Sequence, residues 1–366
     1  MTDRQESPMT QTRPRAVRAV VLAGAVGILL AGCVEGGRTV HPDSVMAEGA
    51  GECPVEVHEE VDTTLTIAYQ PIPNGDLIVR DLGWLEACMP NATITWEKFN
   101  SGGEVIQAFG SGSVDLGLVG SSPATKAVSP PVSVDMQVVW IHDVIGDAES
   151  LVVQEGEGET LAALAGKRVA VPFASTAHYS LLSALEREGM NTSDIELTNL
   201  SPDAMLAAWE RGEIDAAWVW APTLPLLEEN GQIILSAADT AEAGAPTFDL
   251  AGATTEFVEA NPEFMQVWTA AQDAAVRMIK DDPDAAAESI SVQLGITPEE
   301  VAAQMEGYTY LDASEQAGED YFGGTLAQDL INTADFLVDQ QEIDEVNTKE
   351  AYEAAIYSDA IVEVGQ

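Results

Sequence analysis

Three short segments place small hydroxyl residues where an apolar run ends and a helical pattern begins. They are Asn100-Ser101-Gly102-Gly103, Gly120-Ser121-Ser122-Pro123 and the stretch VPFAST, residues 171–176. The first N–H groups of a helix have no partner within the helix, and the helix dipole adds positive charge there. Each turn alone is typical of ordinary N-capping, but such helix starts also bind anions. Three of them at strand carboxyl ends favour a shared ligand site.

The chemistry of these turns suggests a particular kind of anion. The two clearest turns, at residues 120–123 and 171–176, contain no Arg or Lys, so neutral donors would hold the anion. Neutral donors suit a weakly basic tetrahedral oxyanion such as a sulfonate. Asp249, at the end of GAPTFD, could supply the opposite pole by pairing with an ammonium group beside the face of Trp220 or Tyr69. The alternative is that Asp249 caps its own turn.

Other chemistries lack their motifs. No two histidines have metal-ligand spacing on one helix, and there is no C-x-x-C pair. Neither a phosphate loop nor a dinucleotide fingerprint is present. Gly120-Ser121-Ser122-Pro123-Ala124 has alanine where a nucleophile elbow requires glycine. We therefore expect no metal, no cofactor and no nucleophilic catalysis.

The first 33 residues have the pattern of an export signal. Arg13, Arg15 and Arg18 precede a short apolar run that ends in LAGC at Cys33. This ending resembles a bacterial lipobox, which implies cleavage before Cys33 and a lipid anchor on the outer face of the cytoplasmic membrane. A plain signal peptide or an anchor helix is the alternative, and either leaves the domain exported. Residues 34–61, rich in Gly, Glu and Pro, are predicted to form a flexible tether.

The charge of the chain excludes some partners. It has 61 acidic and 15 basic residues, a net charge of -46, and the acids are scattered over polar positions. Such a surface opposes binding to nucleic acid and to anionic lipid headgroups. An anionic ligand must approach against this field, so its site must be short-range and well shaped.

Cys53 and Cys88 remain after the predicted cleavage. In an oxidising compartment they can form a disulfide that pins the N-terminal segment to an early helix. Two buried thiols are the alternative, because spacing alone does not establish the geometry.

The remaining pattern predicts two α/β lobes. Short apolar runs alternate with helical patterns, which is typical of βαβ units and mostly parallel sheets. We assign residues 62–149 to the first part of lobe 1, residues 150–245 to lobe 2, and residues 246–366 to a return to lobe 1 followed by packing helices. A chain of 366 residues with 46% hydrophobic content has enough apolar residues for two cores.

Several dense motifs resemble the taurine-binding group of periplasmic receptors, within the aliphatic sulfonate and nitrate group of type II substrate-binding proteins. They are IAYQ (67–70), W-x-K-F-x-S-G (96–102), GSSP (120–123), G-K-R-V-A-V-P-F-x-S-T-x-H-Y-S-L-L-x-A-L (166–185), A-A-W-x-R-G-E-I-D-A-A-W-V-W-A-P (207–222) and G-A-P-T-F-D (244–249). The stretch PIPNGDLIVRDLGWLEACMP after Gln70 departs from the group's pattern, which bears on the identity of the ligand.

The resemblance implies the type II periplasmic-binding-protein fold, closing on one small ligand and presenting it to a membrane ABC permease. The residues that fall on the matching motifs, and that we expect to contact a ligand such as taurine, are Gln70, Ser101, Ser121, Ser122, Thr176, Trp220 and Asp249, with Tyr69 beside Trp220 as an apolar wall. His178 and Tyr179 either line the cleft or pack the helix start. We expect a monomer.

Three other functions remain open at this point. The same fold could bind an alkanesulfonate without an amine, or a quaternary ammonium compound. It could carry an enzyme, such as one that makes a pyrimidine precursor, although no lysine or histidine cluster of the required kind is apparent. The chain could also be a structural surface lipoprotein.

Overall fold

The computed structural model describes residues 51–366. The predicted signal peptide, Cys33 and residues 34–50 of the predicted tether lie outside the described residues. Across residues 51–366, no helix combines the length and apolar character needed to cross a membrane.

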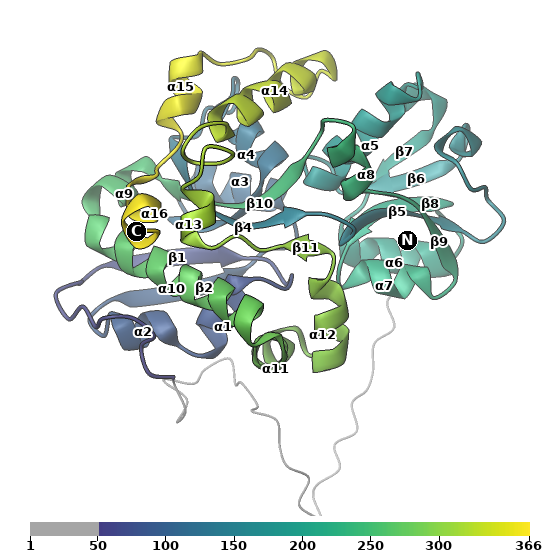
Figure 1. The fold of residues 1–366 in the computed structure, drawn as a ribbon. Coiled ribbons are helices and arrows are strands. Elements are labelled where there is room, and N and C mark those ends of the chain that lie inside the picture. The colour runs from purple at the N-terminus through teal and green to yellow at the C-terminus, as the bar shows by residue number, and fades with distance from the viewer. Residues whose placement is uncertain (1–50) are drawn as a thin grey trace, which may run out of the picture. The chain divides into compact units, whose positions relative to one another are not determined.

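The first sheet has six strands and mixed direction (Figure 1). In spatial order its strands are β11 (Tyr308–Thr309), β4 (Met136–Ile145), β10 (Thr247–Thr254), β3 (Leu116–Gly120), β1 (Thr64–Tyr69) and β2 (Thr93–Lys98). Strand β1 pairs in parallel with β2 and β3, whereas β10 is antiparallel to both β3 and β4. The parallel β1–β2–β3 part agrees with the predicted βαβ units, and β10 is the returning strand.

Helices cover both faces of the first sheet. The helices and 3-10 turns of this part are α1 (Gly75–Asp81), α2 (Trp84–Cys88), α3 (Gly102–Ser111), α4 (Ser121–Val128), α9 (Thr255–Ala260), α10 (Pro262–Asp281), α11 (Pro283–Leu294), α12 (Pro298–Met305), α13 (Ala313–Gln316), α14 (Leu326–Asp339), α15 (Lys349–Ala354) and α16 (Asp359–Val364). Along β1, Ile67 packs in the core under α1 and α10, and its neighbour Ala68 packs in the core under α3 and α14. This alternation is why both faces of the strand are buried.

The second sheet has five strands. In spatial order they are β7 (Glu196–Asn199), β6 (Arg168–Val171), β8 (Ala216–Trp220), β5 (Glu149–Gln154) and β9 (Gly231–Ser236). Its helices are α5 (Thr176–Arg187), α6 (Pro202–Glu210), α7 (Thr223–Glu228) and α8 (Ala237–Glu242), with 3-10 turns at Leu161–Leu164 and Thr192–Asp194. Figure 1 shows α5 and α8 on one side of this sheet and α6 and α7 on the other.

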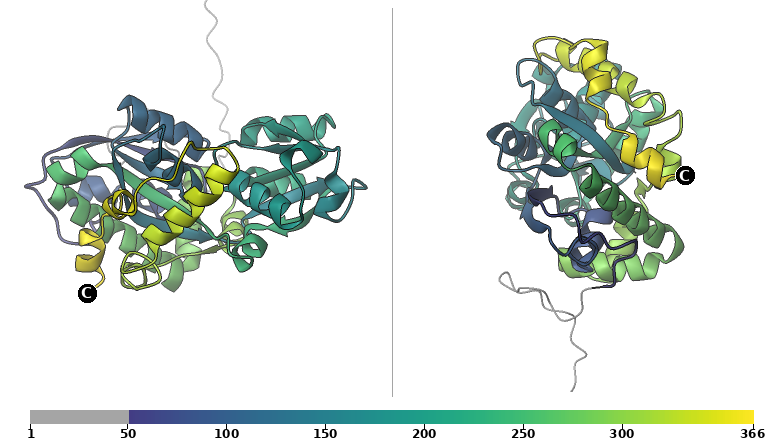
Figure 2. Two further views of the ribbon diagram at one scale, coloured as in Figure 1. Left: turned by 90° about the horizontal axis from the view of Figure 1, so that it is seen from above. Right: turned by 90° about the vertical axis from the view of Figure 1, so that its left-hand side faces the viewer.

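We call the part built on the first sheet lobe 1 and the part built on the second sheet lobe 2. The chain crosses from β4 into β5 through residues 146–148 and returns from β9 to β10 through residues 237–246. These crossings lie close to the predicted boundaries at residues 149 and 245. In the left view of Figure 2 the two sheets occupy separate regions, and the last helices of the chain return to lobe 1.

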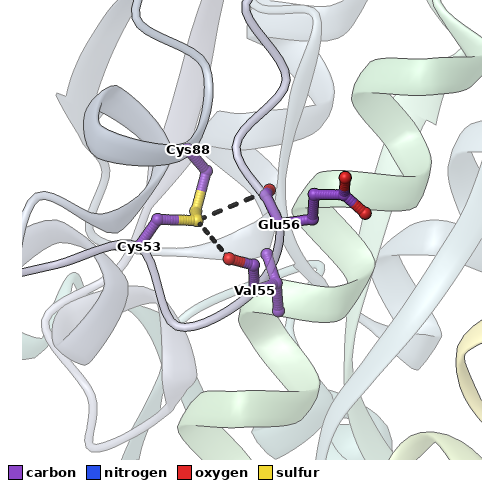
Figure 3. The surroundings of a disulfide bond; sticks show 4 residues. All are labelled: Cys53, Val55, Glu56 and Cys88. Carbon is purple, nitrogen blue, oxygen red and sulfur yellow. Dashed lines mark hydrogen bonds between the residues drawn. A yellow bond between two sulfur atoms is a disulfide. The ribbon is translucent and has the colours of Figure 1, made fainter.

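The N-terminal segment 51–61 is packed against lobe 1, which differs from the predicted tether reaching residue 61. Cys53 and Cys88 form a disulfide, with their Cα atoms 4.9 Å apart (Figure 3). The Gly51 N–H donates to the carbonyl of Leu82, and Val61 is buried in the core. The Cys53 sulfur also lies 3.2 Å from the Val55 carbonyl oxygen, which is a close contact because a disulfide sulfur carries no hydrogen to donate. The disulfide and the buried apolar side chains therefore hold this segment against lobe 1, although its composition is typical of a flexible linker.

An irregularity in β4 decides which side chains face lobe 2. Asp249 of β10 pairs with Asp143, but the next residue, Leu250, pairs with Ile141, so His142 is an extra residue in β4. Such a bulge re-aims the side chains around it. His142 therefore lies in the opposite layer, with its Nε2 3.5 Å from Oδ2 of Asp76.

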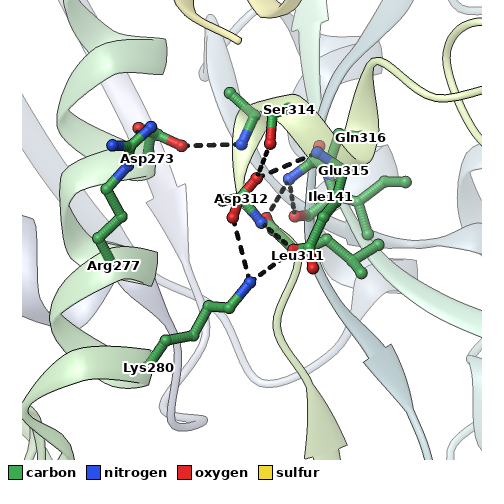
Figure 4. Close-up of polar contacts among 10 residues, drawn as sticks. Ile141, Asp273, Arg277, Lys280, Leu311, Asp312, Ser314, Glu315 and Gln316 are labelled. Carbon is green, nitrogen blue, oxygen red and sulfur yellow. Dashed lines mark hydrogen bonds and ion pairs between the residues drawn. The ribbon is translucent and has the colours of Figure 1, made fainter.

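A cluster of side chains from α10 and α13 holds β4 next to this bulge (Figure 4). The Gln316 amide accepts from the Ile141 N–H at 2.8 Å and donates to the Ile141 carbonyl at 2.9 Å, as a neighbouring strand would. Lys280 of α10 pairs with Asp312 and Glu315 at 3.1 and 2.6 Å. The cluster thus fixes the backbone that carries Asp143.

Candidate functional site

A small cavity lies between the two lobes. The space between its walls is about 350 Å³, including open solvent at its mouth. Its walls are Gln70, Ile72, Gly102, Gly120, Pro123, Ile145, Asp249 and Tyr308 from lobe 1 and Glu149, Ser175, Thr176 and Trp220 from lobe 2. Both lobes therefore contribute to one enclosed site.

Three helix starts meet at this cavity. Gly102 is the first residue of α3, Gly120 is the N-cap of α4, and Ser175 and Thr176 begin α5. These helices have 10, 8 and 12 residues, and the first N–H groups of each have no partner within the helix backbone. Serine caps already accept from one of these N–H groups in α3 and in α5. The remaining N–H groups give the cavity a positive pole made of neutral groups.

Glycine allows the helix starts to approach one another across the cleft. A Cβ at Gly120 would lie 2.6 Å from Cγ2 of Thr176, and a Cβ at Gly102 would lie 2.6 Å from Cγ of Pro123. Both distances are shorter than non-bonded carbons tolerate. The first contact joins lobe 1 to lobe 2, so Gly120 is required for the closed arrangement.

Two carboxyl groups lie beside these helix starts, and one of them, Asp249 on β10, pairs with Gly120 of β3. Asp249 and Glu149 line the cavity, are 7% and 2% exposed, and come from different lobes. Glu149 Oε2 accepts a hydrogen bond of 2.7 Å from Thr176 Oγ1. Burial raises the pKa of Glu149 to about 8, partly offset by the Thr176 hydrogen bond and reinforced by Asp249. None of the described residues that line the cavity is Lys or Arg.

Asp143 lies behind Asp249 and is fully buried. The two are directly opposite one another on β4 and β10, at the bulge. Burial, followed by the charge of Asp249, raises the pKa of Asp143 well above its usual range, and burial raises the pKa of Asp249 to about 7. Both carboxyl oxygens of Asp143 are buried without a hydrogen-bond partner among the described residues.

Four of the eight predicted ligand residues line the cavity: Gln70, Thr176, Trp220 and Asp249. Gln70 donates from Nε2 to the Leu118 carbonyl at 3.4 Å. Thr176 presents its backbone at the helix start, because its hydroxyl is already bonded to Glu149. Trp220 ends β8 and lies opposite Glu149 in the antiparallel ladder.

The other four predicted residues lie outside the cavity wall. Ser101 Oγ caps α3 by accepting from the Glu104 N–H, and Ser121 Oγ accepts from the Phe248 N–H. Ser122 is buried in the first turn of α4, between the wall residues Gly120 and Pro123.

Tyr69 is turned away from the cavity. Its ring lies under the Arg80 guanidinium, 4.3 Å from ring centroid to Cζ, and beside Trp96. It borders a neighbouring pocket that shares the Trp220 wall. The structure therefore gives Tyr69 no place in the wall of the cavity.

His178 and Tyr179 pack the start of α5 and do not line the cavity. The His178 ring stacks on Phe173 with centroids 4.7 Å apart, and Tyr179 meets the edge of Phe336. Both are buried.

Sequence reasoning missed Glu149 and Tyr308. Glu149 is the first residue of a buried apolar strand. A charged residue in that position was the feature of the sequence that could have indicated a binding residue. Tyr308 lies on the two-residue strand β11, within a region expected to be purely packing helices. Within residues 51–366, no group of three or more His, Cys, Asp or Glu side chains is arranged to hold a metal ion.

Comparisons with known proteins agree with this geometry. Residues 62–294 match the NMT1-like family. A taurine-binding periplasmic protein of Escherichia coli (strain K12) is 37% identical over 258 residues, which cover 69% of this chain and 79% of that protein.

Two solved structures show the same fold. The alkanesulfonate-binding protein of Xanthomonas axonopodis pv. citri, bound to MOPS, has a TM-score of 0.66 at 23% identity, covering 80% of this chain and 98% of that chain. The periplasmic aliphatic sulphonate binding protein of Escherichia coli has a TM-score of 0.65 at 24% identity, covering 80% and 92%.

These findings confirm the type II periplasmic-binding-protein fold and the predicted resemblance. They also confirm the prediction of a binding protein rather than an enzyme, since the relatives are substrate-binding proteins. The chain belongs to the NMT1-like family, among the relatives of periplasmic taurine- and sulfonate-binding proteins.

Proposed function

We propose that the protein is the extracytoplasmic receptor of an ABC importer and binds taurine or a closely related aminosulfonate. One observation carries the proposal: the cavity is lined by the starts of α3, α4 and α5, which form a positive pole, and by the carboxyl groups of Asp249 and Glu149, which form a negative one. A zwitterion with a sulfo group and an ammonium group matches both poles. The relative named for taurine supports the same ligand class.

The residues have distinct roles in this proposal. Backbone N–H groups at the three helix starts hold the sulfo oxygens, and Asp249 binds the ammonium group. Trp220 offers its face to the cationic end. Because both lobes contact the ligand, the ligand stabilises the closed arrangement, which is then presented to the permease.

Calorimetry with three solutes tests the ligand class. We expect taurine to bind, and ethanesulfonate, which lacks the amine, to bind at least tenfold more weakly, because it leaves Asp249 buried without a partner. We expect no binding of glycine betaine, whose trimethylammonium group cannot donate to Asp249. Equal affinity for taurine and ethanesulfonate would make the protein an alkanesulfonate receptor, and tight betaine binding would make it a quaternary ammonium receptor.

Gly120→Ala should weaken taurine binding without unfolding the protein. The new methyl group would collide with Cγ2 of Thr176 across the cleft, and overpacking of this kind costs about 1–3 kcal/mol, or roughly 10- to 100-fold in affinity. The Gly120 backbone, at φ -63° and ψ 159°, accommodates alanine. The melting temperature of the ligand-free protein should therefore not change.

The matched control for this variant is Gly120→Ala combined with Thr176→Ser. Serine removes the colliding methyl group and keeps the hydroxyl that donates to Glu149. Calorimetry should show most of the lost affinity restored. If the double variant binds no better than Gly120→Ala, the collision across the cleft is not the cause.

We further propose that the protein is a monomeric lipoprotein, cleaved before Cys33 and lipidated on that residue. The support is the LAGC ending of the apolar leader in the sequence. Mass spectrometry of the mature N-terminus should find a diacylglyceryl Cys33. A mature chain that retains residues 1–32 would contradict this assignment.

A further inference from the structure

Glu149 and Asp249 face the same cavity from different lobes. Glu149 starts β5 of lobe 2, and Asp249 lies on β10 of lobe 1, at the bulge opposite Asp143. Because the two strands belong to separate sheets, the two carboxyl groups come together when the lobes close. The Asp143–Asp249 pair, by contrast, lies within lobe 1 and exists in either arrangement.

The surroundings of Glu149 supply no compensating charge. The groups that face it are Thr176 of α5, Asp249 of β10, Asp143 of β4 and Tyr308 of β11. Its Oε2 accepts from Thr176, whereas its Oε1 is buried without a hydrogen-bond partner among residues 51–366. An unpaired oxygen on a side chain that is 2% exposed and lines the cavity indicates a ligand group that donates to it.

We propose that Glu149 makes closure of the cleft depend on a cationic end of the ligand, so that it selects aminosulfonates and rejects sulfonates that lack an amine. An ammonium group between Glu149 and Asp249 donates to both and cancels the repulsion between them. Without that group, closing the lobes brings two buried carboxylates together, which is strongly unfavourable. Rejection by an unpaired charge is a recognised source of specificity. This inference rests on the proposed function and names the residue that decides between its ligands.

The proposal fixes the sign of a pH effect. Burial raises the pKa of Glu149 to about 8 in the closed cleft, above its ordinary value of 4.5. Closure around a ligand without an amine therefore takes up a proton, and the affinity for that ligand rises as the pH falls from about 8 toward the ordinary value. Asp249, whose pKa burial raises to about 7, acts in the same direction. An ammonium group keeps both carboxylates ionised, so taurine binding should change little over this window.

The test is calorimetry of the full protein with taurine and ethanesulfonate between pH 5.5 and 8. For the wild type we expect ethanesulfonate affinity to rise by about tenfold per pH unit on acidification, with taurine affinity nearly constant. Glu149→Gln should bind ethanesulfonate about 10- to 100-fold more tightly than the wild type at pH 7, bind taurine more weakly, and show a flatter pH profile. A gain of ethanesulfonate affinity is a result that structural damage does not produce.

Glu228→Gln is the matched control. Glu228 is also on lobe 2 and burial also raises its pKa, but it lines a separate groove formed with α12 and not the cavity. This variant should keep the wild-type ratio of taurine to ethanesulfonate affinity at every pH.

Three results would overturn the inference while leaving the proposed function intact. They are a taurine-to-ethanesulfonate ratio that does not vary with pH in the wild type, no gain of ethanesulfonate affinity in Glu149→Gln, and an equal gain in Glu228→Gln. Failure of the wild type to bind either sulfonate would instead overturn the proposed function. The wild-type pH profile needs no variant, so poor folding of Glu149→Gln would not prevent the test.

Discussion

Asp249→Asn should reduce the affinity for taurine by about two to four orders of magnitude. Removing one partner of a buried charge pair costs about 3–5 kcal/mol, and the proposed ammonium group would face an amide in place of a carboxylate. Ethanesulfonate affinity should not fall, because that ligand has no amine to lose a partner. Calorimetry on both ligands gives the coupling between the carboxylate and the amine as a double-mutant cycle.

Asp143→Asn provides an internal comparison for this prediction. Asp143 belongs to the same pair but does not line the cavity. Asparagine has nearly the size of aspartate, and its amide can donate to the neighbouring Asp249 carboxylate, so we expect less than a tenfold loss of taurine affinity. Equal losses in the two variants would mean that the ammonium group does not bind at Asp249.

Removing the disulfide should have the largest effect on stability. The Cys53–Cys88 bond closes a loop with a sequence separation of 35 residues, and native disulfides closing such loops contribute about 2–4 kcal/mol, mainly by restricting the unfolded chain. The double variant Cys53→Ser with Cys88→Ala should lower the free energy of unfolding by that amount. The melting temperature should fall by roughly 3–6 °C.

Urea unfolding of the double variant and of the wild type, with and without reductant, checks this estimate. Reductant should destabilise the wild type and leave the variant unchanged. Taurine affinity should stay within about twofold, since neither cysteine lines the cavity. An unaltered unfolding midpoint in the variant would show that packing of residues 51–61 suffices without the bond.

The sequence predicts the two-lobed architecture well because each strand and each helix can be recognised from the spacing of its own apolar residues. The apolar strands and the helical patterns between them alternate throughout, and the crossings fall where one series ends and the next begins. The predicted tether fails at its C-terminal end for a different reason. Its composition is typical of a linker, but Cys53, Val55 and Val61 attach residues 51–61 to lobe 1.

The site is predictable only in part, and the reason is physical. The hydroxyl of a serine at a helix start can bind a ligand or accept from a nearby backbone N–H group. The hydroxyls of Ser101 and Ser121 accept from backbone N–H groups of the protein and are not part of the cavity wall. Glu149 is harder to predict, because its role depends on lobe 2 closing over Asp249. The bulge at His142 is also invisible in the pattern of β4, yet it determines that Asp143 stands opposite Asp249.

If Cys33 carries the proposed lipid, the disulfide determines which lobe is held at the membrane. Because Cys53 is bonded to Cys88 at the end of α2, a force transmitted through the N-terminal segment would act on lobe 1. The disulfide to α2 would bear this force before β1 does. Lobe 1 would then stay in place at the membrane, and lobe 2 would move when the cleft closes. Fluorophores attached to lobe 2 should travel relative to the bilayer when taurine is added, whereas those on lobe 1 should stay in place.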